Sequence, residues 1–218
     1  LIEFSNWRAT FLIHIPLAVI VLFIGMTRLP VEWKAEERGA FDPLGAVLYG
    51  VAIIVFMIGV STLPNFSSIG MIAAGIAGIW LFFRHEHRHP HPIFDVELFY
   101  SNRVFTMSCL ASLVMYTATF ANVVLVSLYL QYLKGIAPGT TGLVLMAQPL
   151  MMAVVSPVAG KLSDRLEPRI IASLGMLVTA VGLASFALLD EMSSISTVVG
   201  CLLTTGLGFS LFTSPNAN

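Results

Sequence analysis

Residues 43–83 contain no aspartate, glutamate, lysine or arginine, although this run is about twice as long as one membrane crossing requires. A helix needs about 20 apolar residues to cross a hydrocarbon layer about 30 Å thick. Across the whole chain, 57% of the residues are hydrophobic and 11% are charged, whereas charged residues make up roughly 25% of ordinary soluble domains. The sequence therefore predicts an all-α membrane protein.

Uncharged runs of this length predict seven transmembrane helices. The turn-forming stretch PNFSS at 64–68 divides the longest run into two crossings. The chain starts with leucine and shows no signal peptide, so we expect it to begin inside a longer protein. The other predicted crossings lie within residues 9–27, 104–133, 135–160, 170–189 and 192–218.

The basic residues are distributed unevenly between the two predicted sides of the membrane. Of the 11 lysines and arginines, all except Arg8 and Lys134 fall in the loops that follow alternate crossings. Loops rich in lysine and arginine stay in the cytoplasm, so residues 28–42, 84–103 and 161–169 are predicted to be cytoplasmic. The net charge of −1 offers no broad basic surface, and no nucleic-acid partner is predicted.

Small residues recur at helical spacing in three crossings, and we interpret them as sites of close helix packing. Without a hydrophobic drive between helices in lipid, such residues let two backbones approach each other. The three stripes are Gly70, Ala74 and Gly78, then Gly175, Thr179 and Gly182, and finally Gly200, Thr204 and Gly208.

The fourth crossing carries polar residues along one side of its helix, with Asn122 at the edge of the polar arc. Such an arc must face inward, where it either lines a water-filled cavity or hydrogen-bonds to neighbouring helices. The fifth crossing adds Gln148, and Pro149 and Pro157 are expected to bend that helix. The residues of the arc are Ser108, Ser112, Tyr116, Thr119, Ser127 and Gln131.

The polar stretch GKLSDRLEPR at 160–169 resembles the cytoplasmic signature of the major facilitator superfamily, Gly-x-Leu-x-Asp-Arg-x-Gly-x-Arg. Glu167 departs from it, because a glycine is usual at that position. The stretches 6–19, 91–105 and 206–216 are similar to segments of the fourteen-helix drug:proton antiporters in that superfamily, with His14 in place of the usual asparagine.

This resemblance implies that the chain is an internal fragment, covering helices six to twelve of fourteen in a major facilitator bundle. Residues 1–28 would hold the last helix of the N-terminal half, and 29–42 a cytoplasmic loop. Two extra linker helices would occupy 43–84. A cytoplasmic loop with an interfacial segment around Ile93, Val96 and Phe99 would follow at 85–103, and the first four helices of the C-terminal half at 104–218.

The resemblance also implies a function, namely export of amphipathic or cationic drugs by alternating access, driven by a proton gradient, in the cell (inner) membrane. The missing remainder of the chain, protons, lipid and a small-molecule substrate are the expected partners, and neither enzymatic activity nor a cofactor is predicted. The conformational-switch motif would comprise Gly160, Asp164, Arg165 and Arg169, with Asp164 holding neighbouring helix ends together. Substrate-cavity candidates are Tyr116, Thr119, Phe120, Asn122, Gln131 and Gln148.

No acidic residue lies within a predicted crossing, so the proton-coupling carboxylate is expected outside this chain. His14 lies close to Arg8 near the membrane surface, and we interpret it as a structural residue. The alternative functions are a major facilitator carrier for a metabolite, siderophore or lipid, a membrane scaffold subunit, and a seven-helix receptor.

Four histidines alternate along RHEHRHPHP at 84–92. In an extended chain His85, His87, His89 and His91 would share one side, where a divalent metal could bridge two or three of them. A polar cytoplasmic linker explains the same pattern. We therefore predict no metal ligands here and keep metal binding as the alternative.

Overall fold

The computed structural model describes residues 12–28, 41–90 and 92–216. Secondary structure within these ranges is helical, with no strand, as predicted. Helix α2, His14–Arg28, corresponds to the first predicted crossing, whose first residues lie outside the described part of the chain. It is a shorter apolar helix of 15 residues.

Six further helical segments are long and apolar enough to cross a membrane, and they match the other six predicted crossings. Each lies between charged or turn-forming residues, because a charge at the bilayer centre costs roughly 2.5 to 3.5 kcal/mol. The segments are α3 (Pro43–Ser61), α4 (Phe66–Glu86), α6 (Arg103–Leu128) with η1 (Tyr129–Leu133), α7 (Pro138–Leu145) with α8 (Ala147–Ser163), α9 (Pro168–Phe186) and α10 (Ile195–Asn216).

The chain forms two compact units. One unit comprises residues 31–107, and the other comprises residues 1–30 together with 108–218.

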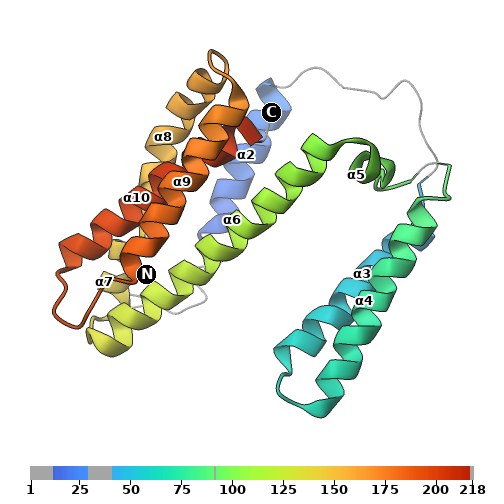
Figure 1. The fold of residues 1–218 in the computed structure, drawn as a ribbon, viewed down its shortest axis with the longest axis horizontal. Coiled ribbons are helices and arrows are strands. Elements are labelled where there is room, and N and C mark those ends of the chain that lie inside the picture. The colour runs from blue at the N-terminus through green and yellow to red at the C-terminus, as the bar shows by residue number, and fades with distance from the viewer. Residues whose placement is uncertain (1–11, 29–40, 91, 217–218) are drawn as a thin grey trace. The chain divides into compact units, whose positions relative to one another are not determined.

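In the unit of residues 31–107, α3 and α4 run side by side and are joined by a short connection (Figure 1). Asp42 caps the start of α3 by accepting a hydrogen bond from the Gly45 amide at 2.9 Å. This hydrogen bond, followed by one from His85, lowers the pKa of the Asp42 carboxyl. The helix therefore begins at a carboxylate that is held in its charged form.

Close contact between α3 and α4 occurs at Gly59 and Gly75. A Cβ added to Gly75 would lie 2.7 Å from the Phe56 backbone nitrogen, and one added to Gly59 would lie 2.8 Å from the Ile72 nitrogen. Only a hydrogen atom fits at such positions. The predicted stripe is therefore partly wrong: Gly78 does pack closely, against Ala52, whereas Gly70 has no atom within 4 Å and Ala74 is exposed.

The segment after α4 packs back onto that helix through aromatic side chains. The ring of Phe94 lies 6.2 Å from that of Phe83 and 5.2 Å from that of Phe99, measured between centroids. Val96 is buried, whereas Ile93 is half exposed. The short helix α5, Glu97–Ser101, follows this segment.

In the other unit, α10 packs against both α8 and α9 (Figure 1). A Cβ on Gly208 would lie 2.4 Å from the Thr179 nitrogen, and one on Gly175 would lie 2.4 Å from the Phe212 nitrogen. Gly182 is similarly close to Thr205. The predicted stripe of Gly175, Thr179 and Gly182 is confirmed, because all three residues are buried against α10.

The small-residue stripe predicted for α10 is only partly correct. Gly208 packs closely, but Gly200 has no atom within 4 Å, and Gly206 meets α8 instead. A Cβ on Gly206 would lie 2.7 Å from the Gln148 carbonyl oxygen. Glycines on two faces of α10 thus allow contact with two different helices.

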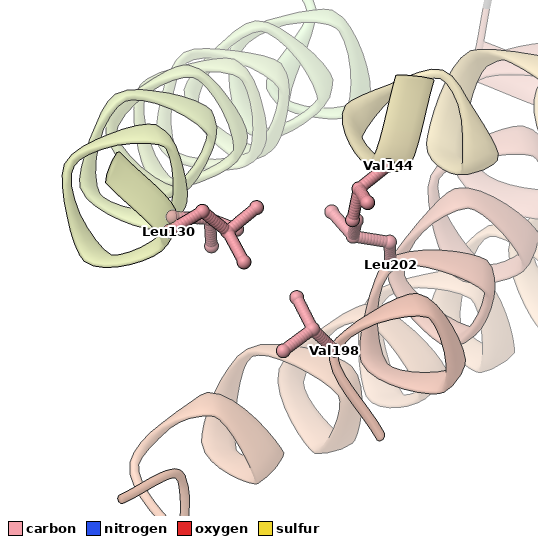
Figure 2. Close-up of a cluster of buried hydrophobic side chains, with 5 residues drawn as sticks. Leu130, Val144, Val198 and Leu202 are labelled. Carbon is pink, nitrogen blue, oxygen red and sulfur yellow. The ribbon is translucent and has the colours of Figure 1, made fainter. Parts of the chain in front are cut away.

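Two groups of buried apolar side chains join α6 to its neighbours. Figure 2 shows Leu130, Val144, Val198 and Leu202 converging, and with Val126 they form the first apolar cluster. The second apolar cluster consists of Met115, Phe209 and Phe212. Because the later residues of α6 meet the earlier residues of α10, and the reverse, these two helices run antiparallel.

Proline interrupts the fifth predicted crossing at one of the two expected positions. Pro149 lacks an N–H to donate to the Leu145 carbonyl, and α7 ends at Leu145, with Met146 between it and α8. Pro157 lies inside α8, which continues through it. The break, at Met146, falls two residues before Gln148.

We predict that Gly208→Ala destabilises the protein by about 1 to 3 kcal/mol, because its methyl group would collide with the α9 backbone at Thr179. Thermal unfolding in detergent measures the effect. Gly200→Ala is the matched control on the same helix, and it should leave the melting temperature nearly unchanged since its surroundings are open. Equal melting temperatures for both variants would contradict the close contact.

Candidate functional site

Two polar residues interrupt the buried face of α6 between the two apolar clusters. Met115 belongs to the second apolar cluster and Val126 to the first, and Thr119 and Asn122 lie between them in the helix. The buried face of α6 consists of Met115, Thr119, Asn122 and Val126, and Leu130 of η1 continues it.

Helix α10 presents polar backbone and side-chain groups at the corresponding level. Thr205 and Gly206 lie between Leu202 of the first apolar cluster and Phe209 of the second. Gln148 belongs to this level because its backbone carbonyl packs against Gly206. We call Thr119, Asn122, Gln148 and Thr205 the polar layer.

Three members of the polar layer have buried polar atoms without a hydrogen-bond partner among the described residues: Thr119 Oγ1, Asn122 Nδ2 and Gln148 Oε1. Each side chain is at most 8% exposed. A buried polar atom without a partner costs about 1 to 3 kcal/mol. Thr205 differs, since its hydroxyl donates to the Cys201 and Leu202 carbonyls of its own helix.

Aromatic rings lie beside the polar layer on α6. Tyr116 and Phe120 are stacked with centroids 6.3 Å apart, and Tyr116 meets Phe209 edge-on at 5.2 Å. Tyr116 is 45% exposed and Phe120 is 69% exposed. These two predicted site residues therefore form an accessible aromatic surface, in contrast to the buried amides.

Gln131 does not join the other candidates. It lies in η1, next to Leu130 of the first apolar cluster, and its Nε2 donates to Ser127 Oγ of the preceding turn at 2.8 Å. The structure thus places Thr119 and Asn122 on the buried face of α6 and Gln148 in α8 against Gly206 of α10. Gln131 lies apart from this level, beside the first apolar cluster. Thr205 was not predicted as a site residue. Its position four residues before Phe209, on the same face of α10, is the sequence signal that could have identified it.

The switch motif connects the ends of α8 and α9. Asp164 is the C-cap of α8, and its side chain is exposed, as are those of Arg165 and Arg169. Within the described ranges no ion pair joins these three residues. Gly160 faces α10, because a Cβ there would lie 3.4 Å from Ser214 Oγ.

The connection between α9 and α10 is held against the other end of α6. Tyr129 donates its hydroxyl hydrogen to the Asp190 carbonyl at 2.6 Å, and Lys134 Nζ donates to the carbonyls of Glu191 and Ser193. A hydrogen bond from the Ser193 hydroxyl lowers the pKa of the Asp190 carboxyl. The ammonium group of Lys134 thus ties the end of η1 to the loop between α9 and α10.

An all-helical, multi-pass membrane protein with a buried, unpaired polar layer has the architecture expected of a membrane transporter. Residues 1–218 match the family model of the Major Facilitator Superfamily. The chain belongs to this superfamily, as its sequence motifs predicted.

The chain is similar to curated transporters with different names. It is 30% identical to the riboflavin transporter RibZ of Clostridioides difficile (strain 630), over 99% of this chain and 47% of that protein. It is 29% identical to the uncharacterized transporter YebQ of Escherichia coli (strain K12), over 99% of this chain and 48% of that protein. The multidrug efflux pump LfrA of Mycolicibacterium smegmatis is 28% identical, over 95% of this chain and 42% of that pump. The chain thus spans about half the length of these relatives.

We predict that Thr119→Val raises the melting temperature, because valine keeps the shape of threonine and removes a buried hydroxyl that has no partner. The gain should be about 1 to 3 kcal/mol, measured by thermal unfolding in detergent. Thr205→Val is the matched control, since that hydroxyl has two acceptors. A loss of stability in Thr119→Val equal to that in the control would contradict the assignment of an unpaired group.

Proposed function

We propose that the chain is part of a proton-coupled multidrug efflux transporter, which exports amphipathic or cationic drugs by alternating access. Relatives named as multidrug resistance or efflux proteins support this proposal. The argument from the structure rests on one observation, the unpaired polar atoms of Thr119, Asn122 and Gln148. We propose that a substrate supplies their missing partners.

The composition of this region suits an amphipathic substrate. Asn122 and Gln148 offer a hydrogen-bond donor and an acceptor without charge, and the rings of Tyr116 and Phe120 offer an apolar surface. An aromatic face also attracts organic cations by about 0.5 to 2 kcal/mol. A drug with a flat, apolar body and one polar or cationic group would use both kinds of contact.

In this proposal the energy comes from a proton gradient, and the coupling carboxylate lies in another part of the transporter. The crossings of this chain from residue 104 onward contain no aspartate or glutamate, because Asp164, Glu167, Asp190 and Glu191 all lie in the loops between them. The basic loops 28–42, 84–103 and 161–169 would face the cytoplasm of a cell whose inner membrane holds the protein.

A second candidate is a carrier for a neutral metabolite. The riboflavin transporter RibZ is 30% identical to the chain, and uncharged amides can recognise a hydrogen-bonding substrate as well as a drug. The two candidates differ in breadth, because a metabolite carrier should discriminate among substrates that a drug pump accepts.

We predict that Asn122→Leu and Gln148→Leu each weaken substrate affinity about tenfold in the complete transporter, because each removes one hydrogen bond worth roughly 1 to 1.5 kcal/mol. Dye efflux driven by an imposed proton gradient, with ethidium and with riboflavin as separate substrates, measures the change. Thr204→Val is the control, since its hydroxyl bonds only to its own helix at the Gly200 carbonyl.

Efflux of several unrelated dyes would favour the drug pump, whereas transport of riboflavin alone would favour the metabolite carrier. Unchanged transport in both amide variants would reject the polar layer as the substrate site.

We also predict that Asp164→Asn slows transport without reducing membrane insertion. The carboxylate would stabilise a neighbouring helix N-terminus by about 0.3 to 2 kcal/mol, which is enough to bias two balanced conformations. Efflux rate per inserted transporter, quantified from membrane fractions, measures the effect. Full activity in Asp164→Asn would reject the gating role.

A further inference from the structure

A cluster of ligand-type side chains lies where α3 begins and α4 ends. His85 Nε2 is 2.7 Å from Asp42 Oδ2, although the two residues are 43 positions apart in the sequence. His89 follows His85 by about one helical turn, and their rings lie 5.3 Å apart between centroids. One ligand atom from each of Asp42, His85 and His89 lies within 4.8 Å of the others.

A fourth group, Glu86, faces the same space. The Glu86 side chain is 2% exposed, and its Oε2 accepts a hydrogen bond from the Phe94 amide at 2.8 Å. Its other oxygen, Oε1, is buried without a hydrogen-bond partner among the described residues. Both Glu86 Oε1 and Asp42 Oδ2 lie 2.5 Å from the position that a Cβ on Gly45 would occupy. Gly45 therefore leaves room for two carboxylate oxygens to approach each other.

Two buried carboxylates in one small space require a positive charge or a proton between them. The two histidines beside the carboxylates, His85 and His89, favour a metal cation over a proton. Imidazole nitrogen is a preferred ligand of zinc and of similar divalent transition metals, whereas calcium and magnesium prefer oxygen ligands. Asp42, His85 and His89 would supply two nitrogens and one oxygen, which is a common zinc ligand set when completed by a fourth ligand.

We propose that Asp42, His85 and His89 bind a divalent transition-metal ion of the zinc class, with Glu86 Oε1 completing or directly supporting the coordination. The partly exposed histidine rings can move to shorten the observed spacing to zinc–ligand distances of about 2.0 to 2.2 Å. The metal would join the start of α3 to the chain just beyond α4, at the opposite end of the pair from the Thr62–Asn65 connection.

This site differs from a metal bound by an extended run of alternating histidines. Helix α4 continues to Glu86, and a turn follows it, so His85 and His89 share a face while His87 between them is exposed. His91 lies outside the described residues. The helical arrangement therefore assigns different roles to neighbouring histidines, and this difference can be tested.

The experiment uses the complete transporter, purified in detergent with a tag that contains no histidine and stripped with EDTA. Zinc chloride alone is the probe, with isothermal titration for affinity and elemental analysis after desalting for stoichiometry. We expect a single zinc ion per chain, no competition from excess magnesium, and a loss of affinity of about 10- to 100-fold or more in His85→Ala, His89→Ala and Asp42→Asn.

His87→Ala is the matched control and should bind zinc as the unmodified protein does. His89→Cys should retain binding that His89→Ala loses, because a thiolate is also a zinc ligand. The melting temperature of each zinc-free variant shows that it is folded. Absence of zinc binding by the unmodified protein, or an equal loss in His87→Ala and His89→Ala, would overturn the proposal and leave a proton as the group between the carboxylates.

Discussion

Close backbone contact at glycine is the constraint on which the packing of α8, α9 and α10 depends. In lipid, burying one apolar helix surface against another gains little, so helices associate where backbones can touch. Gly175 and Gly208 bring α9 and α10 into such contact, and Gly206 does the same for α8 and α10. With two faces of α10 fixed in this way, its remaining face meets α6 through both apolar clusters. The polar layer lies between these two clusters, at the level where Gly206 contacts α8.

The membrane-spanning helices were predictable from the sequence because the cost of charge in a bilayer confines charged residues to the helix ends. The faces of the helices were harder to predict. The stripe of Gly175, Thr179 and Gly182 was correct, but Gly70 and Ala74 were assigned to an interface that they do not form. A helix in lipid is apolar on both its packed and its exposed sides, so hydrophobicity cannot distinguish the two, and small residues occur on either.

The candidate site was predictable to a similar extent. The polar arc on α6 correctly placed Thr119 facing inward, and Asn122 at its edge is also buried. Helical spacing alone does not show that the Gln131 side chain donates a hydrogen bond to Ser127, one turn earlier. The pairing of Asp42 with His85 was beyond sequence reasoning, because it depends on two helix ends meeting in space. The alternating histidines share one side only in an extended chain, whereas α4 runs to Glu86 and a turn follows, which brings His85 and His89 to one face.

The arrangement of the polar layer has an energetic consequence for transport. Apolar side chains of α6 and α10 meet on either side of the polar layer, in the two apolar clusters, and Asn122 is buried between them. Each unpaired group therefore keeps a free-energy cost of about 1 to 3 kcal/mol in the folded protein. Under the proposed function, a bound substrate recovers part of this energy only in the conformation that exposes the layer to it. A ligand shifts a conformational equilibrium only by the difference between its affinities for the two conformations. A site whose polar groups lack hydrogen-bond partners when it is empty can therefore couple substrate binding to the conformational change.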